Sequence, residues 1–445
     1  MSSKTIVSNW GNYPRLECGF FEPSNQDLLC SKVDQLPSVI ARGNGRCYGD
    51  SALGENIIST LKLNKILSFD LNLGIITCQA GVLLSDILEV TVPKGFFLPV
   101  TPGTKFITVG GALASDIHGK NHHSEGCFSD HVHSFDLLLS NGKVVSCSKE
   151  STPDLFWLTA GGMGLTGIIL SVTFKLKPIE TAYIRQESIK AKNLQEIMEL
   201  FEESENWTYT VSWIDCLAKG KHIGKSIMMR GEHASRAELG KISDPLVLKK
   251  KLKLNVPIEL PDFTLNSFSV NAFNFLFYNK QQKRFIKNFP GYDSFFYPLD
   301  SIDNWNRIYG KSGFTQYQFV IPKEASKEGL TKILNKIAES GEGSFLAVLK
   351  LFGKANSDAI LSFPFEGYTL ALDFRINKKV FALLDELDKI VFDYGGRLYL
   401  TKDVRMSPEF FEKTYGDKKQ EFLAKLKKAV PDNKFNSVQS IRLGL

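Results

Sequence analysis

Several features that mark membrane-spanning, secreted or metal-stapled proteins are missing from this 445-residue sequence. No stretch approaches the roughly 18 consecutive apolar residues of a membrane-spanning helix. The start, MSSKTIVSNWGNYPRL, lacks the apolar core of a secretory signal. The seven cysteines are scattered without a Cys-x-x-Cys pair, which argues against a disulfide framework and a structural zinc site. We therefore expect a cytoplasmic protein.

A large excess of one charge is missing too. The 54 Lys and Arg residues against 48 Asp and Glu residues leave a net charge of +6. This excess is too small to predict a nucleic-acid partner, and it is compatible with an anionic small ligand. The chain is 43% hydrophobic and 23% charged, which is typical of a globular protein with two or three domains.

Histidine is scarce, yet five of the seven histidines fall within one short stretch. They are His118, His122, His123, His131 and His133. Such clustering suggests a metal, but His122 and His123 are adjacent and no His-Glu-x-x-His motif occurs. We expect no metal site. The remaining alternatives are packed or surface histidines for four of them, and a polar role for His118 and Lys120 in an anionic or redox site.

Three glycine-rich segments follow predicted strands or helices. In residues 42–50 (RGNGRCYGD), glycines let backbone N–H groups converge on a diphosphate, and the alternative is a glycine hairpin with surface arginines. In residues 101–114, TPGT and TVGGALA would let a ring or a phosphate pack against the main chain. Gly162-x-Gly164-x-x-Gly167 matches a dinucleotide fingerprint but reverses its strand-to-helix order, so we reject that site. It is either a tight corner or a turn beside another flat cofactor.

Two lysines lie within or at the end of apolar predicted strands. Lys350 and Lys402 are each either snorkelling edge residues or buried charges that await an anion or serve as a tuned acid or base. No Gly-x-Ser-x-Gly elbow or Walker motif occurs, so hydrolase and P-loop functions have no motif in their favour.

The character of the chain changes near residue 182. Before it, many short strands predict an α+β arrangement rather than regular βαβ repeats. After it, we expect helices over 188–205 and 324–341 between strands such as 209–214. Residues 235–295 are first basic and then dense in Phe and Asn. They are either a surface excursion with core aromatics or a basic, aromatic lid that touches a membrane or a lipid-linked substrate.

The glycine-rich segments occur in a familiar order. RGNGRCYGD (42–50), TPGTKFITVGGALASDIHGKNHH (101–123) and LFWLTAGGMGLTGIILSVTFKLKP (155–178) resemble the FAD domain of the vanillyl-alcohol oxidase/p-cresol methylhydroxylase family. Further segments are similar to one branch of that family, the decaprenylphosphoryl-β-D-ribose oxidases. They are YQFVIP (317–322), LKLFG (349–353), LSFP (361–364) and GGRLYLTKD (395–403). The resemblance covers about residues 10–410 and is weakest over 215–300.

This resemblance implies an α+β fold with a two-subdomain FAD-binding domain. Residues 1–182 and 396–445 would form that domain, and residues 183–395 would be an inserted antiparallel-sheet substrate domain. Some relatives attach FAD covalently through a histidine in the diphosphate loop. Arg46 and Cys47 stand in that loop here, so we expect non-covalent FAD.

The resemblance also implies a set of site residues. Diphosphate contacts would be Gly43, Asn44, Gly45, Arg46, Cys47 and Tyr48. Ribityl and flavin contacts would be Thr108, Gly110, Gly111, Ala114, His118 and Gly119, completed by Gly162, Gly167 and Ile168. Substrate contacts would be Lys120, Trp213, Gln316, Gln318, Lys350 and Phe352, and the catalytic residues Lys402, His118 and Tyr399. A substrate-pocket cysteine of the branch is replaced by Ala371 and a neighbouring Asn by Thr369, which predicts resistance to inhibitors that attack that cysteine.

The implied reaction is oxidation of a secondary hydroxyl of a sugar to a ketone. In this branch the hydroxyl is the 2'-OH of a polyprenyl-phosphate-linked ribose. A separate short-chain dehydrogenase/reductase would then reduce the ketone, so that the pair epimerises one centre in cell-wall arabinose synthesis. We expect Lys402 to position the hydroxyl or to take its proton. The rival functions are an FAD oxidase or dehydrogenase of a soluble polyol, aldonolactone or nucleotide sugar, and a non-enzymatic anion- or lipid-binding protein.

Overall fold

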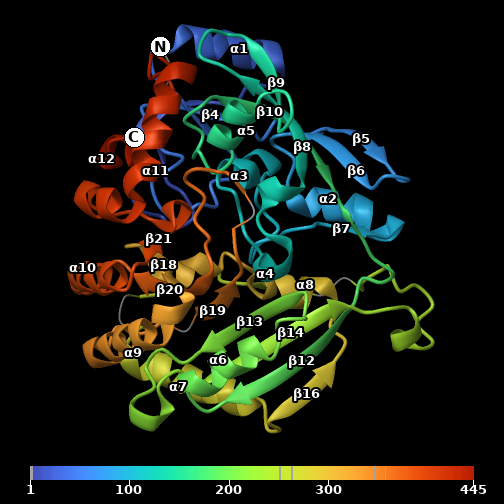
Figure 1. Cartoon of the computed structure of the whole chain (residues 1–445), viewed down its shortest axis with the longest axis vertical. Coiled ribbons are helices and arrows are strands. Elements are labelled where there is room, and N and C mark those ends of the chain that lie inside the picture. Colours follow the sequence, from blue (N-terminus) through green and yellow to red (C-terminus); the bar gives the residue numbers. More distant parts are fainter. Residues whose placement is uncertain (1–3, 250–251, 262–263, 345, 356) are drawn as a thin grey trace.

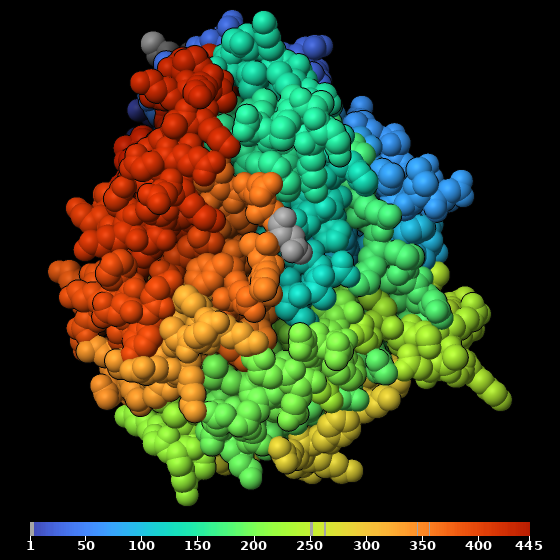
Figure 2. Space-filling model, viewed as in Figure 1, coloured from blue at the N-terminus to red at the C-terminus, as the bar shows by residue number. Residues whose placement is uncertain are grey.

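The computed structural model describes residues 4–249, 252–261, 264–344, 346–355 and 357–445. Residues from about 400 onward pack beside the N-terminal part, and the segment between these parts forms the opposite end of the molecule (Figures 1 and 2). The α+β class predicted from the sequence is confirmed. Boundaries at 182 and 395 remain predictions.

A small mixed sheet of order β1-β2-β4-β3 begins the fold. Its strands are β1 (Lys4–Val7), β2 (Leu16–Phe21), β4 (Asn56–Ser59) and β3 (Ile40–Arg42). Helix α1 (Gln26–Gln35) connects β2 to β3. The residue before it, Asn25, caps the helix, because its side chain accepts a hydrogen bond from the backbone N–H of Leu28. Strand β3 ends at Arg42, so the RGNGRCYGD loop leaves the sheet directly.

A five-stranded antiparallel sheet of order β5-β6-β10-β8-β9 follows. Its strands are β5 (Ile66–Asp70), β6 (Ile75–Gln79), β10 (Ile168–Lys175), β8 (Val132–Leu138) and β9 (Val144–Ser148). The helices of this part are α2 (Leu84–Thr91), α3 (Val109–Ala114), α4 (His122–Glu125) and α5 (Pro153–Thr159). Helix α3 packs against β6 and β10, so its N-terminal loop lies at the junction of the sheet with the rest of the chain.

An eight-stranded antiparallel sheet of order β16-β12-β14-β13-β19-β20-β18-β21 dominates the second part. Its strands are β16 (Phe285–Asn288), β12 (Ile184–Ala191), β14 (Ser226–His233), β13 (Tyr209–Ile214), β19 (Ala347–Phe352), β20 (Gly367–Arg375), β18 (Phe314–Pro322) and β21 (Arg397–Leu398). One face carries buried apolar side chains such as Leu349, Leu370 and Phe319, which pack against helices α6 (Leu194–Glu202), α9 (Lys323–Ser340) and α10 (Lys378–Asp393). These helices do not cover the opposite face of the sheet.

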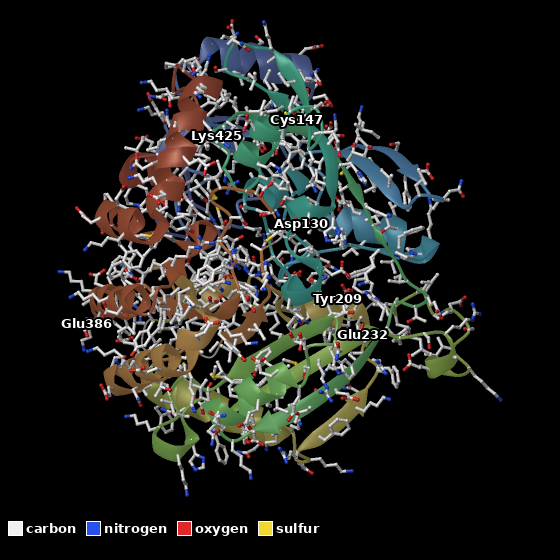
Figure 3. All side chains as sticks on the ribbon, in the orientation of Figure 1. Asp130, Cys147, Tyr209, Glu232, Glu386 and Lys425 are labelled. Carbon is white, nitrogen blue, oxygen red and sulfur yellow. The ribbon has the colours of Figure 1, made fainter. Side chains whose placement is uncertain are left out.

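The remaining elements are short, apart from one helix. In the first part, the two-residue strands β7 (Phe96–Phe97) and β11 (Lys177–Pro178) pair with each other. The second part adds the strands β15 (Leu254–Asn255) and β17 (Ile302–Asp303) and the helices α7 (Ser267–Lys280) and α8 (Tyr292–Phe296). Tyr209 and Glu232 lie where α4 meets this sheet (Figure 3). No helix in the described part of the chain is long and apolar enough to cross a bilayer.

The C-terminal segment returns to the N-terminal part as α11 (Pro408–Ala429) and α12 (Val438–Leu443). Lys425 of α11 lies 3.1 Å from the Asp154 carboxylate of α5 (Figure 3). Phe435 forms a parallel bridge with Val39 beside β3. The last helix thus lies against the loop that follows β3.

One predicted helix is too long at its start. The charged pattern over 188–205 predicts a single helix, but residues up to Ala191 belong to β12 and α6 begins at Leu194. The side chain of Asn193 caps α6 by accepting from the backbone N–H of Glu196, which fixes the helix start. Pairing of β12 with β14 and β16 outweighs the local helical pattern before it.

Candidate active site

One face of the eight-stranded sheet collects the predicted substrate-side residues. Trp213 pairs with Val348, Val348 with Ala371, and Ala371 with Gln318, which makes one row across four strands. Directly paired residues share a face, and alternate residues along a strand return to it. By this alternation Gln316, Lys350, Phe352, Thr369 and Asp373 share the face of that row. It is the face opposite helices α6, α9 and α10.

His118 approaches this face from the loop after α3. Its Nε2 atom lies 3.2 Å from Nε2 of Gln318, and its Nδ1 atom lies 3.2 Å from Nζ of Lys350. Burial and the neighbouring Lys350 hold the pKa of the imidazole well below its ordinary value, so the ring is neutral. A neutral ring carries one N–H, so one partner must accept: Lys350 as a free amine, or a reversed Gln318 amide.

Three partly buried lysines converge around His118. Loss of hydration lowers the pKa of Lys120 and of Lys350 to about 7, and that of Lys402 to about 8. Lys350 is further affected by the charges of Lys402 and Lys120. Nζ of Lys120 donates to the carbonyl of Phe295 and lies 4.4 Å from the centre of that ring. Both the charged and the neutral form of each lysine are therefore populated near neutral pH.

Asp373 is the acidic partner of this group, and the sequence analysis did not name it. Its side chain is 1% exposed, and Oδ1 accepts a 2.6 Å hydrogen bond from Nε2 of Gln316. Burial raises the pKa of this carboxyl group to about 7, against the opposing effect of Lys402. The charge of Asp373 in turn raises the pKa of Lys402. The sequence could have indicated Asp373, because it stands two and four residues after Ala371 and Thr369 and therefore shares their face of strand β20.

Lys402 lies against the glycine-rich loop of residues 42–50. Its Nζ atom is 4.1 Å from the centre of the Tyr48 ring, and the backbone N–H of Tyr48 donates to the carbonyl of Thr401. A Cβ atom on Gly49 would lie 1.7 Å from the carbonyl oxygen of Asp403, so only glycine permits this approach. The predicted diphosphate loop and the turn that carries Lys402 are thus one packed unit.

Helix α12 clamps the same turn, which is formed by the 3-10 helix Leu400–Lys402. Gln439 donates to the carbonyl of Leu400 at 2.7 Å. Arg442 donates to both carboxylate oxygens of Asp50, at 2.8 and 3.1 Å, and to Asp403 at 2.9 Å. Asp50 and Asp403 are almost fully buried, so one guanidinium joins two desolvated carboxylates. Sequence reasoning missed Arg442 because Asp50 lies 392 residues away.

Tyr399 and two phenylalanines form the aromatic wall of the site. The Tyr399 ring stacks on Phe363 at 4.6 Å and lies 5.5 Å from the His118 ring, and the Phe352 ring lies 4.6 Å from His118. The Tyr399 hydroxyl donates to the backbone carbonyl of residue 115. Buried Arg397 donates to the carbonyls of residues 362–364 and so holds the segment that carries Phe363.

Residues of the predicted cofactor loops make hydrogen bonds and ring contacts with neighbouring parts of the chain. The Arg46 guanidinium lies 3.9 Å from the Trp10 ring, and Asn44 donates to the carbonyl of Phe106 at 2.8 Å. Gly45 has a left-handed φ of 59°, and the carbonyl of Cys47 accepts from the N–H of Trp10. Thr108 caps α3, which contains Gly110, Gly111 and Ala114, by accepting from the N–H of Gly111. Gly43 packs against Thr108, and Gly119 against the side chain of Asn121.

The Gly162–Gly167 segment is a tight corner between α5 and β10. A Cβ atom on Gly162 would lie 2.2 Å from the carbonyl of Leu158, and one on Gly167 would lie 2.5 Å from the carbonyl of Leu138. Ile168, at the start of β10, is fully buried. Packing within the chain accounts for these glycines, and their contact with FAD stays a prediction.

Three of the other four clustered histidines have local partners, and the fourth, His133, is exposed. Nε2 of His123 lies 2.7 Å from the carbonyl of Trp207, and that of His131 lies 2.9 Å from the carbonyl of Glu125. The His122 ring lies 4.6 Å from Phe352. Among the residues that the structure describes, no group of three or more His, Cys, Asp or Glu side chains is placed to hold a metal ion.

These residues fit a bound FAD chemically. FAD carries a doubly charged diphosphate, and its flavin ring becomes anionic on reduction. Arg46 is partly buried within the 42–50 loop, and burial lowers its pKa. Lys120, Lys350 and Lys402 lie in the part of the site near the sheet face, where the Asp373 carboxylate raises the pKa of Lys402. These cations are buried and outnumber the acidic groups near them. Buried cations of this kind donate strong hydrogen bonds to an anionic ligand such as FAD.

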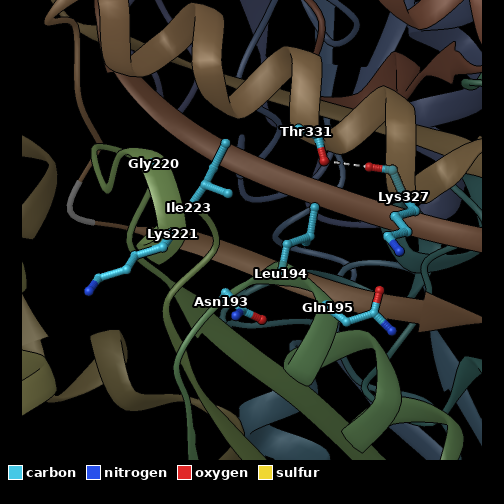
Figure 4. A pocket seen from close by; sticks show the side chains of 8 residues that line it. All are labelled: Asn193, Leu194, Gln195, Gly220, Lys221, Ile223, Lys327 and Thr331. Atoms are coloured by element: carbon cyan, nitrogen blue, oxygen red, sulfur yellow. Dashed lines mark hydrogen bonds between the residues drawn. The ribbon is translucent and has the colours of Figure 1, made fainter.

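Two hollows lie outside this cluster. The first, between the start of α6 and α9, is lined by Asn193, Leu194, Ile223, Lys221 and Lys327, among others (Figure 4). Its eight lining residues include no predicted site residue. The second extends from the start of α7 to Tyr309 and Asp373, and so adjoins the site.

The chain is similar to known proteins over most of its length. The sequence pattern of the family described as FAD binding domain matches residues 30–148. The chain is 40% identical over 457 aligned residues to decaprenylphosphoryl-beta-D-ribose oxidase of Mycolicibacterium smegmatis, covering 99% of this chain and 97% of that protein.

More distant relatives share only part of the chain. A D-lactate dehydrogenase of Anaerostipes hadrus is 35% identical over 35% of the chain and 34% of its own length. The L-gulonolactone oxidase of Bos taurus is 26% identical over 40% of the chain and 41% of its own length. These relatives are named as a dehydrogenase and an oxidase, and they leave most of the chain unmatched.

Proposed function

The chain belongs to the decaprenylphosphoryl-β-D-ribose oxidase family and is an FAD-dependent oxidoreductase, and from this premise we propose that it oxidises the 2'-hydroxyl of a polyprenyl-phosphate-linked ribose to a ketone. The similarity to the M. smegmatis oxidase runs through both the cofactor loops and the eight-stranded sheet, because 99% of the chain is aligned. The observation that carries the proposal is the convergence of Lys120, Lys350, Lys402 and His118 around one sheet face.

Oxidation of a carbinol removes a hydride from carbon and a proton from oxygen. FAD, when bound, accepts the hydride. The hydroxyl proton requires a base, and we assign that role to the amine of Lys402. With a pKa of about 8, this lysine is ~25% neutral at about pH 7.5, against ~0.1% for an ordinary lysine. Its altered environment therefore raises the amount of free base more than a hundredfold.

The other cations suit the phosphate of the substrate. Lys350 contacts His118 on the sheet side, and Lys120 lies over the Phe295 ring on the other side. Gln318 and Gln316 supply amide groups for sugar hydroxyls, and Trp213 and Phe352 supply apolar surface. In this assignment Lys120 and Lys350 bind the phosphate of the substrate. Gln318 orients the imidazole ring of His118, and Tyr399 completes the aromatic wall of the site.

Substrate screening under anaerobic conditions tests the reaction. Flavin absorbance should bleach with polyprenyl-phosphate ribose and stay unchanged with free ribose, aldonolactones and nucleotide sugars. Bleaching by a soluble, phosphate-free polyol alone would instead establish the rival oxidase. A protein that cannot be loaded with FAD would refute the whole assignment.

Two substitutions test the role of Lys402. Lys402→Met removes the amine, and Lys402→Arg keeps a cation that cannot act as a base at neutral pH. Both variants should retain FAD and lose at least about a hundredfold in the rate of flavin reduction. Normal reduction by Lys402→Arg would show that the charge, and not a free amine, is required.

Two partners follow from the proposed chemistry. The ketone must be reduced elsewhere, and we propose a separate short-chain dehydrogenase/reductase, whose addition should yield the epimer at the oxidised carbon. Residues 235–295 are proposed to make peripheral contact with the membrane that holds the lipid carrier. The basic and aromatic composition of that segment supports this contact.

A further inference from the structure

Helix α7 exposes an apolar face that packs against no described part of the chain. Phe268, Phe275 and Leu276 are 81%, 63% and 68% exposed, and helical spacing places them on one side. The helix, SFSVNAFNFLFYNK, contains no acidic residue and is apolar on both sides. Helices of that kind are normally buried. It lies at the end of the molecule away from the chain termini (Figure 1).

The inner face of α7 is fixed on the substrate side of the fold. The Phe277 ring lies 4.7 Å from the ring of Trp213, and Asn274 donates to the Asp215 carboxylate at 2.7 Å. Val270 and the N-cap residue Asn266 line the hollow that also reaches Asp373. An opening toward the Asp373 carboxylate therefore lies beside the exposed apolar face.

The surrounding chain is strongly basic. Residues 249–287 contain eight Lys and Arg residues and two acidic residues, a net charge of 8 − 2 = +6, which equals the net charge of the whole chain. Basic side chains at both ends of this stretch, including Lys253, Lys280 and Lys283, are exposed. A phospholipid surface with anionic headgroups complements apolar side chains flanked by cations, whereas a soluble acidic partner would not need the phenylalanines.

A second exposed apolar segment is bonded to the stretch of chain that leads to the same opening. Leu252, Leu254 and Ile258 are 99%, 68% and 66% exposed. Their segment hydrogen-bonds to residues 302–307 through the N–H groups of Val256 and Leu260. That stretch leads directly to Tyr309, which lines the hollow at α7. Exposed apolar residues thus lie on α7, which lines the opening, and on a segment bonded to the stretch that leads to Tyr309.

We infer that α7 is a membrane-docking helix, whose outer face enters the headgroup region of an anionic bilayer and brings the opening beside Asp373 to the lipid surface. The inference that a lipid-linked sugar enters by this opening rests on the proposed function, while docking itself does not. A substrate with a long prenyl tail would then keep its tail in the bilayer as its sugar reaches the site.

Vesicle sedimentation tests docking without any substrate. The FAD-loaded protein should sediment with vesicles of phosphatidylcholine and phosphatidylglycerol, less with phosphatidylcholine alone, and less at high salt. Replacing both Phe275→Ser and Leu276→Ser should weaken the partition at least about tenfold. The matched control is Leu71→Ser with Leu73→Ser, which changes two exposed leucines of the β5–β6 turn and should have no effect.

Turnover distinguishes the docking surface from the proposed reaction. The Phe275/Leu276 variant should oxidise vesicle-borne substrate at least about tenfold more slowly and a water-soluble short-chain phosphate sugar at the normal rate. Wild-type protein that stays in solution with both kinds of vesicle would overturn the inference, whatever its activity. A dimer that disappears in the same variant would assign the face to a second copy and overturn it as well. Vesicle binding without any flavin bleaching by the sugar would refute the proposed function alone.

Discussion

Replacing Asp373 by asparagine should move the pH dependence of catalysis to lower pH. The Asp373 carboxylate raises the pKa of Lys402, which still falls to about 8 because of burial. Asparagine keeps the shape and an oxygen that accepts from Gln316, but it removes the charge. A neighbouring opposite charge typically changes the pKa of a group by about one unit or more. At about pH 7 the neutral fraction of Lys402 would then rise from ~10% to ~50%, roughly fivefold.

Anaerobic stopped-flow measurement of flavin reduction over a range of pH checks this shift. The acid limb of the rate profile should move down by about one pH unit while FAD binding and the visible spectrum stay normal. Asp373→Glu, which retains the charge, is the matched control and should leave the limb near its original position. An unmoved limb in Asp373→Asn would refute the coupling. Loss of reduction at every pH would assign the proton acceptor to Asp373 itself.

Four further outcomes follow from the same geometry. Arg442→Gln should lower kcat at unchanged KM, and it should lower the free energy of unfolding by about 3–5 kcal/mol because it leaves two buried carboxylates without their cation. Arg442→Lys should restore part of the loss. The pKa of Lys120 and Lys350 is lower in the folded chain than in the unfolded one, so the unfolded chain binds more protons between about pH 7 and 10. The free energy of unfolding should therefore rise with pH across that window, by at most about 1.4 kcal/mol per unit for each lysine, and Lys350→Met should flatten the rise in thermal melts. Acid precipitation should release all FAD into the supernatant, whereas a yellow pellet would reveal a covalent bond. Ala371→Cys should create sensitivity to inhibitors that attack a thiol, while the wild type should be inert to them in an activity assay.

The local parts of the site were predictable because they depend on short stretches of sequence. Tyr209–Ile214 forms a strand as expected, and strand alternation places Gln316 and Gln318 on one face of β18. The α+β class followed from the many short predicted strands, and FAD followed from the family resemblance of the glycine-rich segments; both are confirmed. Here local pattern and resemblance point to the same arrangement.

The parts that escaped prediction depend on pairings between distant segments. Residues 188–191 look helical on their own and become strand because β14 and β16 flank them. Asp373 is a single carboxylate in an apolar strand, and only its register against Gln316 reveals its partner. Arg442 lies far along the chain from Asp50, so no local pattern links them. Burial and long-range register, which set the pKa of Lys402, are properties of the folded chain alone.

The most direct test of the proposed reaction uses polyprenyl-phosphate ribose that carries deuterium at C2. Under anaerobic conditions the account predicts that this substrate bleaches the flavin more slowly than the unlabelled one, and that the product is the 2-keto sugar without deuterium at C2. Failure of either substrate to bleach the flavin, or a product that keeps its deuterium at C2, would contradict it.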